Sequence, residues 1–216
     1  MKKIAIVAGG PKDFVPDLSK FDENNILWIG ADLGAEVILE QGRRLDIAVG
    51  DFDSVSSESL MRIKESAGRT DTYPNEKNET DLEIALLEAL KYQPEQILLF
   101  GVTGGRLDHT MVNIQILYPL LTKGIKGTII DQQNQVELVG QGVHTLKKIS
   151  QYPYVSFLPV TLAIKGLSLE GFYYPLLDAE LSYGSTRCIS NQLIEDRGTF
   201  SFTEGILLVI RSHDVI

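Results

Sequence analysis

Short apolar runs recur along the amino-terminal part of the chain, and several of them end in glycine. These runs are Lys2–Ala8, Asn25–Gly30, Leu45–Gly50, Gln96–Gly101 and Lys126–Asp131. Brief, continuous apolar runs are typical of strands that are buried on both faces, as in a parallel sheet. We therefore expect these runs to form the strands of one such sheet.

Segments with helical spacing separate the apolar runs. We expect helices over Ala35–Gln41, Ser57–Ala67, Thr80–Leu90 and His109–Leu121. The third is marked most clearly, because Thr80 stands three residues before Glu83, at the spacing of a capping box. In the last helix, Asp108 is placed to cap the first turn. The alternation of strands and helices predicts an α/β domain with a mostly parallel, doubly wound sheet.

The pattern changes after Asp131. Apolar and polar positions then alternate with period two in short runs, namely Val136–Val139, Val143–Lys147, Tyr154–Leu158, Leu162–Ile164, Cys188–Ile194, Thr199–Phe202 and Ile206–Ile210. Runs of this kind, separated by glycine or polar turn residues, predict an all-β sandwich or barrel. We expect an α/β domain over residues 1–132 and an all-β sandwich domain over residues 133–216.

Composition and charge narrow the classes of partner. The net charge of −9 argues against a nucleic-acid-binding surface, which needs basic patches to neutralise phosphates. The single cysteine, Cys188, excludes an intramolecular disulfide and fits a reducing compartment. No apolar stretch approaches the ~20 residues of a membrane span. We therefore expect a cytoplasmic protein without nucleic-acid or membrane partners.

Aspartates follow the predicted strands. Asp32 comes after one run, Asp51 and Asp53 after the next, and Asp108 after the run at Gln96–Gly101. The carboxyl ends of parallel strands meet at one edge of the sheet, where open α/β sheets bind ligands. Carboxylates gathered there would repel one another unless a cation neutralises them, which predicts bound Mg²⁺ and a polyphosphate substrate. Each aspartate, taken singly, is also explained by ordinary turn chemistry.

Two further segments offer phosphate-binding groups. In Gly104-Gly105-Arg106 the glycines free the backbone to surround an anion, and arginine presents a fork of donors. Thr80 and Asp81 open the third predicted helix, whose amino terminus attracts phosphate. Asp81 has a purely structural explanation of equal weight, since the helix dipole stabilises an acid in the first turn.

The chain lacks several familiar catalytic motifs. It contains no Walker-type phosphate loop, no Gly-x-Gly-x-x-Gly after the first strand, and no Gly-x-Ser-x-Gly nucleophile elbow. No zinc-type spacing of Cys and His occurs either. Covalent catalysis therefore has no clear candidate residue.

Taken together, the motifs resemble those of the thiamine pyrophosphokinase family. The resemblance covers about residues 5 to 212 and lies in the order and spacing of these segments: Gly30–Ala35, Gly50–Ser54, Glu79–Asp81, Gly104–His109, Ser185–Gln192, Gly198–Phe200 and Gly205–Leu208. It implies transfer of the pyrophosphoryl group of ATP to the thiamine hydroxyl, giving thiamine diphosphate and AMP. It also implies a homodimer with active sites between subunits.

The resemblance carries roles to individual residues. Asp32, Asp51, Asp53 and Asp81 would be catalytic, and three of them (Asp51, Asp53 and Asp81) would bind Mg²⁺. The ATP phosphates would be bound by Gly104, Gly105, Arg106, Asp108 and Thr80, and thiamine by Ser190 and Asn191. Some members of the family place an aromatic residue against the thiamine rings. The single tryptophan of this chain, Trp28, does not fit that role, because it lies in a predicted core strand.

Other functions remain open from the residues alone. A pyrophosphokinase for another precursor alcohol, such as a pterin, would share the amino-terminal features. Asp51 and Asp53, as an Asp-x-Asp pair after a strand, also suit a glycosyltransferase that binds a metal and a nucleotide sugar. A nucleotide-sensing module is a non-enzymatic alternative, although it has little use for so many acids at the ligand edge.

Overall fold

The computed structural model of the chain describes residues 2–21, 26–74, 76 and 78–214. The chain divides into two compact units, residues 1–132 and 133–216, each of which is considered by itself. Asn25, with which one predicted strand begins, lies outside the described residues. Within the described ranges, no helix combines the length and the apolar character needed to cross a membrane.

The first unit is built on a parallel sheet. Its strands follow the spatial order β4-β3-β2-β1-β5-β6, and every neighbouring pair is parallel. The chain proceeds from β1 outward to β4 and then returns to place β5 on the other side of β1, so the topological switch point lies between β1 and β5. The strand bounds are β1 Lys3–Val7, β2 Ile26–Ala31, β3 Ile47–Gly50, β4 Arg69–Thr72, β5 Gln96–Phe100 and β6 Lys126–Ile130.

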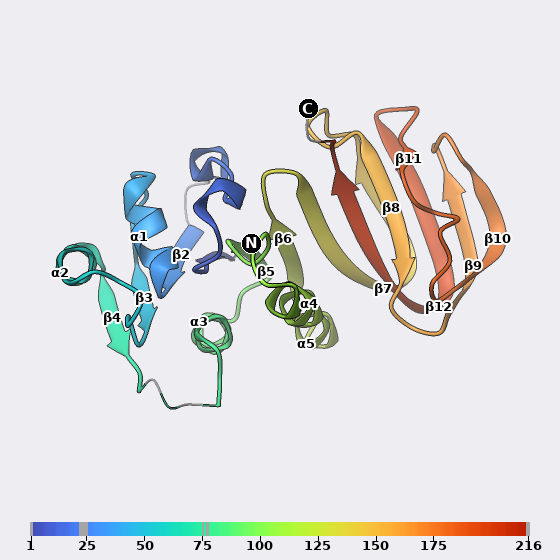
Figure 1. The fold of residues 1–216 in the computed structure, drawn as a ribbon. Coiled ribbons are helices and arrows are strands. Elements are labelled where there is room, and N and C mark those ends of the chain that lie inside the picture. The colour runs from blue at the N-terminus through green and yellow to red at the C-terminus, as the bar shows by residue number, and fades with distance from the viewer. Residues whose placement is uncertain (1, 22–25, 75, 77, 215–216) are drawn as a thin grey trace. The chain divides into compact units, whose positions relative to one another are not determined.

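Helices cover both faces of this sheet. Figure 1 shows α1 and α3 on opposite sides of the strands, as right-handed crossovers require when the winding direction reverses. Two short 3-10 helices, η1 and η2, follow β1. The bounds are η1 Lys12–Phe14, η2 Leu18–Phe21, α1 Leu33–Glu40, α2 Ser57–Ser66, α3 Asp81–Leu90, α4 Leu107–Gln115 and α5 Leu117–Thr122.

The apolar runs fill the interior of the first unit, as their pattern predicts. Trp28 stacks against Phe100 in the core, with ring centroids 6.1 Å apart. The capping prediction for α3 is confirmed, because Thr80 Oγ1 accepts a hydrogen bond from the backbone N–H of Glu83 at 3.2 Å. The strand β4 was not predicted; its sequence RTDT lacks an apolar run, since it lies at the edge of the sheet.

The prediction for the last helix of this unit is wrong in two respects. The segment forms two helices, α4 and α5, which meet at Ile116 instead of continuing as one. Asp108 does not cap the first turn: Arg106 occupies the cap position without a side-chain cap bond, and Asp108 lies inside the helix. The side chain of Asp108 bonds instead to the N–H of His109 and to Arg106.

The second unit consists of antiparallel strands around one apolar core. The long strand β12 pairs with β7 along most of its length, with β9 in its first half and with β8 in its second half. The rings of Phe157, Phe172 and Phe200 pack together inside. The bounds are β7 Asn134–Lys147, β8 Tyr154–Pro159, β9 Ala163–Glu170, β10 Leu176–Ser182, β11 Asn191–Gln192 and β12 Arg197–Ser212.

Several predicted boundaries in this unit are wrong. The two runs before Lys147 form the single strand β7, and the last two runs form the single strand β12. In β12 the register shifts between Phe202 and Ile206, which interrupts the alternation without ending the strand. The run at Cys188–Ile194 contributes only β11, and β10, with its irregular pairing to β9, was not predicted.

Candidate active site

Three aspartates come together at the carboxyl ends of two neighbouring strands. Asp32 follows β2, whereas Asp51 and Asp53 follow β3. Each offers a carboxylate oxygen, and these atoms all lie within 4.8 Å of one another. The sequence-based expectation that strand-end carboxylates gather at this edge therefore describes these three residues well.

An uncommon backbone geometry holds this acidic group. Asp32 and Phe52 have positive φ angles, 50° and 58°, which residues with a side chain seldom adopt. The ring of Phe52 is buried in the core and anchors the turn between the two acids of β3. Asp51 Oδ1 accepts a hydrogen bond from the N–H of Asp53 at 3.1 Å. Backbone conformations of this kind concentrate at functional sites, where the surrounding structure maintains them.

The electrostatics of Asp32 fit a bound cation. Burial raises the pKa of the Asp32 carboxyl above its usual range, and the charges of Asp81, Asp51 and Asp53 raise it further, against a hydrogen bond from the N–H of Leu33. Oδ1 of Asp32 is buried and, among the described residues, accepts no hydrogen bond. A buried carboxylate oxygen without a donor is costly. Mg²⁺, which prefers oxygen ligands, would compensate both the charge and the missing contact.

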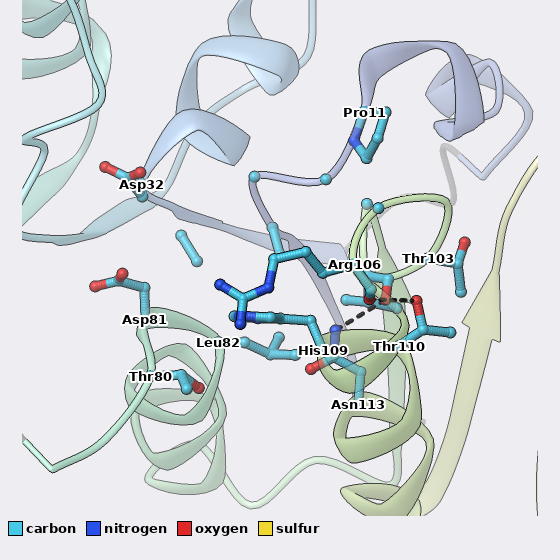
Figure 2. A pocket seen from close by; sticks show the side chains of 17 residues that line it. Pro11, Asp32, Thr80, Asp81, Leu82, Thr103, Arg106, His109, Thr110 and Asn113 are labelled. Carbon is cyan, nitrogen blue, oxygen red and sulfur yellow. Dashed lines mark hydrogen bonds between the residues drawn. The ribbon is translucent and has the colours of Figure 1, made fainter.

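Asp81 lies beside this group without belonging to the closest three. It is the first residue of α3, and its charge contributes to the raised pKa of Asp32. Figure 2 shows Asp32 and Asp81 on one side of a pocket, with Arg106 and His109 extending toward them from the other. Asp81 is therefore placed to approach a ligand bound in that pocket.

The pocket lies at the topological switch point of the sheet. It has a volume of about 310 Å³ and is lined by the loops that follow β1 and β5, by Ala31 and Asp32 at the end of β2, by the start of α3, and by residues of α4 as far as Asn113. Sequence reasoning missed Gly9, Gly10 and Asn113 as lining residues. The glycines could have been found, because they follow the first strand at the same edge of the sheet. Asn113 gave no local signal, because its contact lies outside its own helix: its Nδ2 donates to the carbonyl of Val102 at 2.8 Å.

The loop after β5 requires glycine at one position. Gly104 has a φ of 84°, and a Cβ there would lie 2.4 Å from the ring of Phe14. A side chain is therefore excluded by both conformation and contact. At Gly105 a Cβ would meet only Pro11, at 3.7 Å, so its backbone approach to a ligand is not obstructed. Gly105 and Arg106 line the pocket, whereas Gly104 lies behind them against Phe14.

Arg106 and Asp108 form an exposed two-point ion pair. Nε of Arg106 donates to Oδ1 of Asp108 at 3.1 Å, and the guanidinium also donates to Oδ2 at 2.5 Å. The hydrogen bonds that Arg106 donates to Asp108 lower the pKa of the Asp108 carboxyl and raise the pKa of Arg106. Asp108 is not among the residues that line the pocket or the acidic group. In this arrangement Asp108 orients the arginine.

The candidates for the second substrate lie in the second unit. Ser190 is exposed and its N–H donates to Oγ of Ser156 at 3.0 Å. Asn191 is buried, and its amide bonds to both the N–H and the carbonyl of Tyr174, at 3.0 and 2.9 Å. These residues adjoin a hollow of about 290 Å³ that Tyr174, Arg187 and Asn191 help to line. Sequence reasoning missed Tyr174, although adjacent exposed tyrosines are a recognisable aromatic signal.

Together these features define a class of protein. A doubly wound α/β unit with grouped carboxylates and a glycine-lined pocket at its switch point is typical of enzymes that bind a phosphorylated nucleotide with a divalent cation. Comparison with known proteins identifies the family. Residues 18–129 match the family model described as thiamin pyrophosphokinase, catalytic domain, and residues 143–207 match thiamin pyrophosphokinase, vitamin B1 binding domain. The chain belongs to the thiamine pyrophosphokinase family, which confirms the resemblance in its sequence.

Full-length relatives support this assignment. A thiamine pyrophosphokinase of Bacillus subtilis (strain 168) is 46% identical over 214 residues, covering 99% of this chain and 100% of that protein. The crystal structure of thiamine pyrophosphokinase from Bacillus subtilis has a TM-score of 0.94 at 44% identity, with 99% of this chain and 100% of that chain covered. Thiamin pyrophosphokinase from Candida albicans shares the fold, with a TM-score of 0.83 at 17% identity, covering 98% and 89% of the two chains.

Proposed function

We propose that this chain transfers the pyrophosphoryl group of ATP to the hydroxyl of thiamine, producing thiamine diphosphate and AMP. Membership of the family supports this reaction. The structural observation that carries it is the grouping of Asp32, Asp51 and Asp53 within 4.8 Å, next to the pocket at the switch point. Attack on the β-phosphorus of ATP needs positioning and neutralisation of charge more than it needs a protein nucleophile.

The metal would be bound by strand-end carboxylates. Asp51 and Asp53 are the first candidates, with Asp81 as a further ligand and Asp32 close enough to contribute. Mg²⁺ at this position would supply neutralisation of the negative charge on the phosphate oxygens and on the departing AMP. The carboxylates in turn fix where the polyphosphate lies relative to the pocket.

The ATP phosphates would be bound by the loop after β5 and by the start of α3. The backbone at Gly105, the guanidinium of Arg106, and the helix amino terminus at Thr80 supply donors at one edge of the sheet, while Gly104, packed against Phe14, shapes the loop behind them. Asp108 supports this binding through Arg106, to which it is paired. Its role is therefore to orient the arginine.

One of the carboxylates beside the metal would also orient the thiamine hydroxyl or accept its proton. Asp81 is the first choice, because it lies at the pocket and is not one of the three closest acids. Asp32 is the second choice. We expect Asp81→Asn to lose most of its turnover while it still binds ATP. Near-normal turnover of Asp81→Asn would remove it from this role.

The thiamine rings would be bound by the second unit. Asn191 and the exposed side chain of Tyr174 help to line a hollow there, and Ser190 precedes Asn191 in the chain. The match of residues 143–207 to a vitamin B1 binding domain supports this division of labour, with ATP bound by residues 1–132. We also propose a homodimer in which active sites form between subunits.

Protection against thermal unfolding distinguishes this function from its alternatives. A ligand that binds only the folded protein raises the melting temperature, and the rise grows with the logarithm of its concentration relative to its Kd. We expect a non-hydrolysable ATP analogue with Mg²⁺, followed by thiamine, to raise the melting temperature in two steps. A rise with a nucleotide sugar instead would indicate a glycosyltransferase, and a rise with a pterin alcohol in place of thiamine would indicate a related pyrophosphokinase.

A further inference from the structure

A sixth aspartate lies at the ligand edge of the parallel sheet. Asp131 directly follows β6, and β6 pairs in parallel with β5, from which the glycine loop emerges. Asp131 is only 3% exposed, which is unusual for an aspartate. It belongs neither to the acidic group of three nor to the lining of the pocket.

Asp131 is bonded to the glycine loop. Thr103 Oγ1 donates a hydrogen bond to Oδ2 of Asp131 at 2.7 Å. Thr103 lies between Val102 and Gly104, in the loop that presents Gly105 and Arg106 to the pocket. Figure 2 shows Thr103 at the side of the pocket away from Asp32 and Asp81, with its hydroxyl turned away from them. The Thr103 hydroxyl therefore donates to a buried carboxylate and does not point toward the acidic group.

The next residue secures the neighbouring loop. The N–H of Gln132 donates to the carbonyl of Phe14 at 3.0 Å, and its side-chain amide donates to the carbonyl of Val15 at 3.1 Å. The ring of Phe14 occupies the space in which a Cβ of Gly104 would lie. The two residues after β6 thus fix the glycine loop from two directions, one through Thr103 and the other through Phe14.

We propose that Asp131 is a positioning residue for ATP binding, which it supports by fixing the glycine loop through the hydroxyl of Thr103. A buried carboxylate is retained only where donors compensate its lost hydration, so the Thr103 bond stabilises one conformation of the loop. A loop held in its binding conformation loses less entropy when a ligand binds. The proposal rests on the proposed function in one respect, namely that this loop binds the polyphosphate.

The sharpest test compares Thr103→Val with Thr103→Ser. Valine keeps the volume but removes the hydroxyl, whereas serine keeps the hydroxyl. We expect Thr103→Val to raise the KM for ATP about tenfold, as loss of a hydrogen bond to a charged group predicts, with the KM for thiamine unchanged. Thr103→Ser should restore the KM for ATP. Thr122→Val is the matched control, because the Thr122 hydroxyl donates to a nearby backbone carbonyl, that of Pro119 on α5.

Asp131→Ala, which removes both side-chain acceptors for the Thr103 hydroxyl, separates positioning from direct contact with ATP. If Thr103 acts through Asp131, adding Thr103→Val to Asp131→Ala should raise the KM for ATP much less than it does in the parent protein. If the two substitutions raised the KM for ATP by independent factors that multiply in the double variant, Thr103 would contact ATP directly and the proposal would be overturned. An unchanged KM for ATP in Thr103→Val, or an equal rise in both KM values, would also overturn it.

A binding measurement separates this proposal from the reaction itself. Titration calorimetry of the parent protein with a non-hydrolysable ATP analogue and Mg²⁺ reports nucleotide binding without thiamine. If the parent binds the analogue but makes no thiamine diphosphate, the proposed function fails, and the affinities of the Thr103 variants still test the role of Asp131. If the parent makes thiamine diphosphate and Thr103→Val binds the analogue normally, only the role of Asp131 fails.

Discussion

The carboxylates of Asp32 and Asp51 bring oxygen atoms within 4.8 Å of each other, although the two residues end different strands. Strands β2 and β3 are parallel neighbours, and the N–H of Asp32 donates to the carbonyl of Val49 at 2.9 Å. The close approach is therefore imposed by the sheet itself. Two carboxylates that the backbone holds close together either bind a cation or lower the stability of the fold through their repulsion. Both effects can be measured.

Asp32→Asn should stabilise the metal-free protein while it impairs catalysis. Because the pKa of Asp32 is raised in the folded state, its contribution to stability is present at low pH and is lost as the pH rises through that pKa. At pH 7 the neutral amide avoids this cost, and asparagine tolerates a positive φ. We expect a higher melting temperature in EDTA at pH 7, and a smaller difference from the parent near pH ~4, the pKa of an ordinary aspartate. A lower melting temperature at pH 7 would contradict this explanation.

Asp51→Asn should weaken magnesium binding and turnover together. Removal of a charged oxygen ligand should lower kcat by roughly tenfold or more and shift the Mg²⁺ titration to higher concentration. Asp17→Asn is the matched control, since Asp17 is exposed and an asparagine oxygen can keep its bond from the N–H of Ser19. An unchanged Mg²⁺ titration for Asp51→Asn would exclude this residue as a ligand.

Gly104→Ala should impair ATP binding, whereas Gly124→Ala should not. Both glycines have positive φ angles, 84° and 70°, so alanine costs about 1–2 kcal/mol of strain at either position. Only at Gly104 would the new Cβ also collide with Phe14, because nothing lies within 4 Å of the corresponding position at Gly124. Gly104→Ala should lose more stability than Gly124→Ala, because it must also displace the ring of Phe14, and the KM for ATP should rise in Gly104→Ala alone. Equal KM values for ATP in the two variants would show that the conformation of this loop does not affect ATP binding.

Glu88→Gln should destabilise the first unit in a pH-dependent way. Burial alone would raise the pKa of Glu88, but hydrogen bonds from Lys91 and Arg69 outweigh it and hold the pKa below its usual range. A lowered pKa contributes stability above the pKa of the unfolded chain and loses it as the pH falls through the folded value.

The loss expected for Glu88→Gln at pH 7 is about 1–3 kcal/mol, since two cations lose a buried partner. The difference from the parent should shrink as the pH is lowered below about 4.5, the ordinary pKa of glutamate. Urea unfolding at pH 7 and at a pH below about 4.5 measures this difference in the free energy of unfolding. Glu83→Gln, an exposed change on the same helix, is the control and should remain close to the parent at both. A loss for Glu88→Gln that is equal at both pH values would indicate altered packing instead of charge.

Local patterns were sufficient to predict the features that local physics determines. The buried strands and the capping of α3 by Thr80 follow from short-range spacing, and the grouping of Asp32 with Asp51 follows from the rule that parallel strands end at one edge. The family, and with it the reaction, could also be predicted, because its motifs retain their order along the chain.

Features that depend on tertiary contacts could not be predicted. Asp108 has the sequence position of a helix cap, but α4 begins one residue earlier, at Leu107, so Asp108 lies inside the helix and pairs with Arg106. The bond between Thr103 and the buried Asp131 joins residues that are 28 positions apart in the sequence. In the second unit, β12 pairs with β7 on both sides of the register shift after Phe202, so the strand continues. The alternation of apolar and polar residues breaks at that point and therefore predicts two separate strands.

Product analysis after incubation of the purified protein with ATP, Mg²⁺ and thiamine tests the central claim most directly. We expect thiamine diphosphate and AMP in equal amounts, with both products lost when EDTA removes the metal. ADP together with thiamine monophosphate would contradict pyrophosphoryl transfer, and full activity in EDTA would contradict a metal site at Asp32, Asp51 and Asp53.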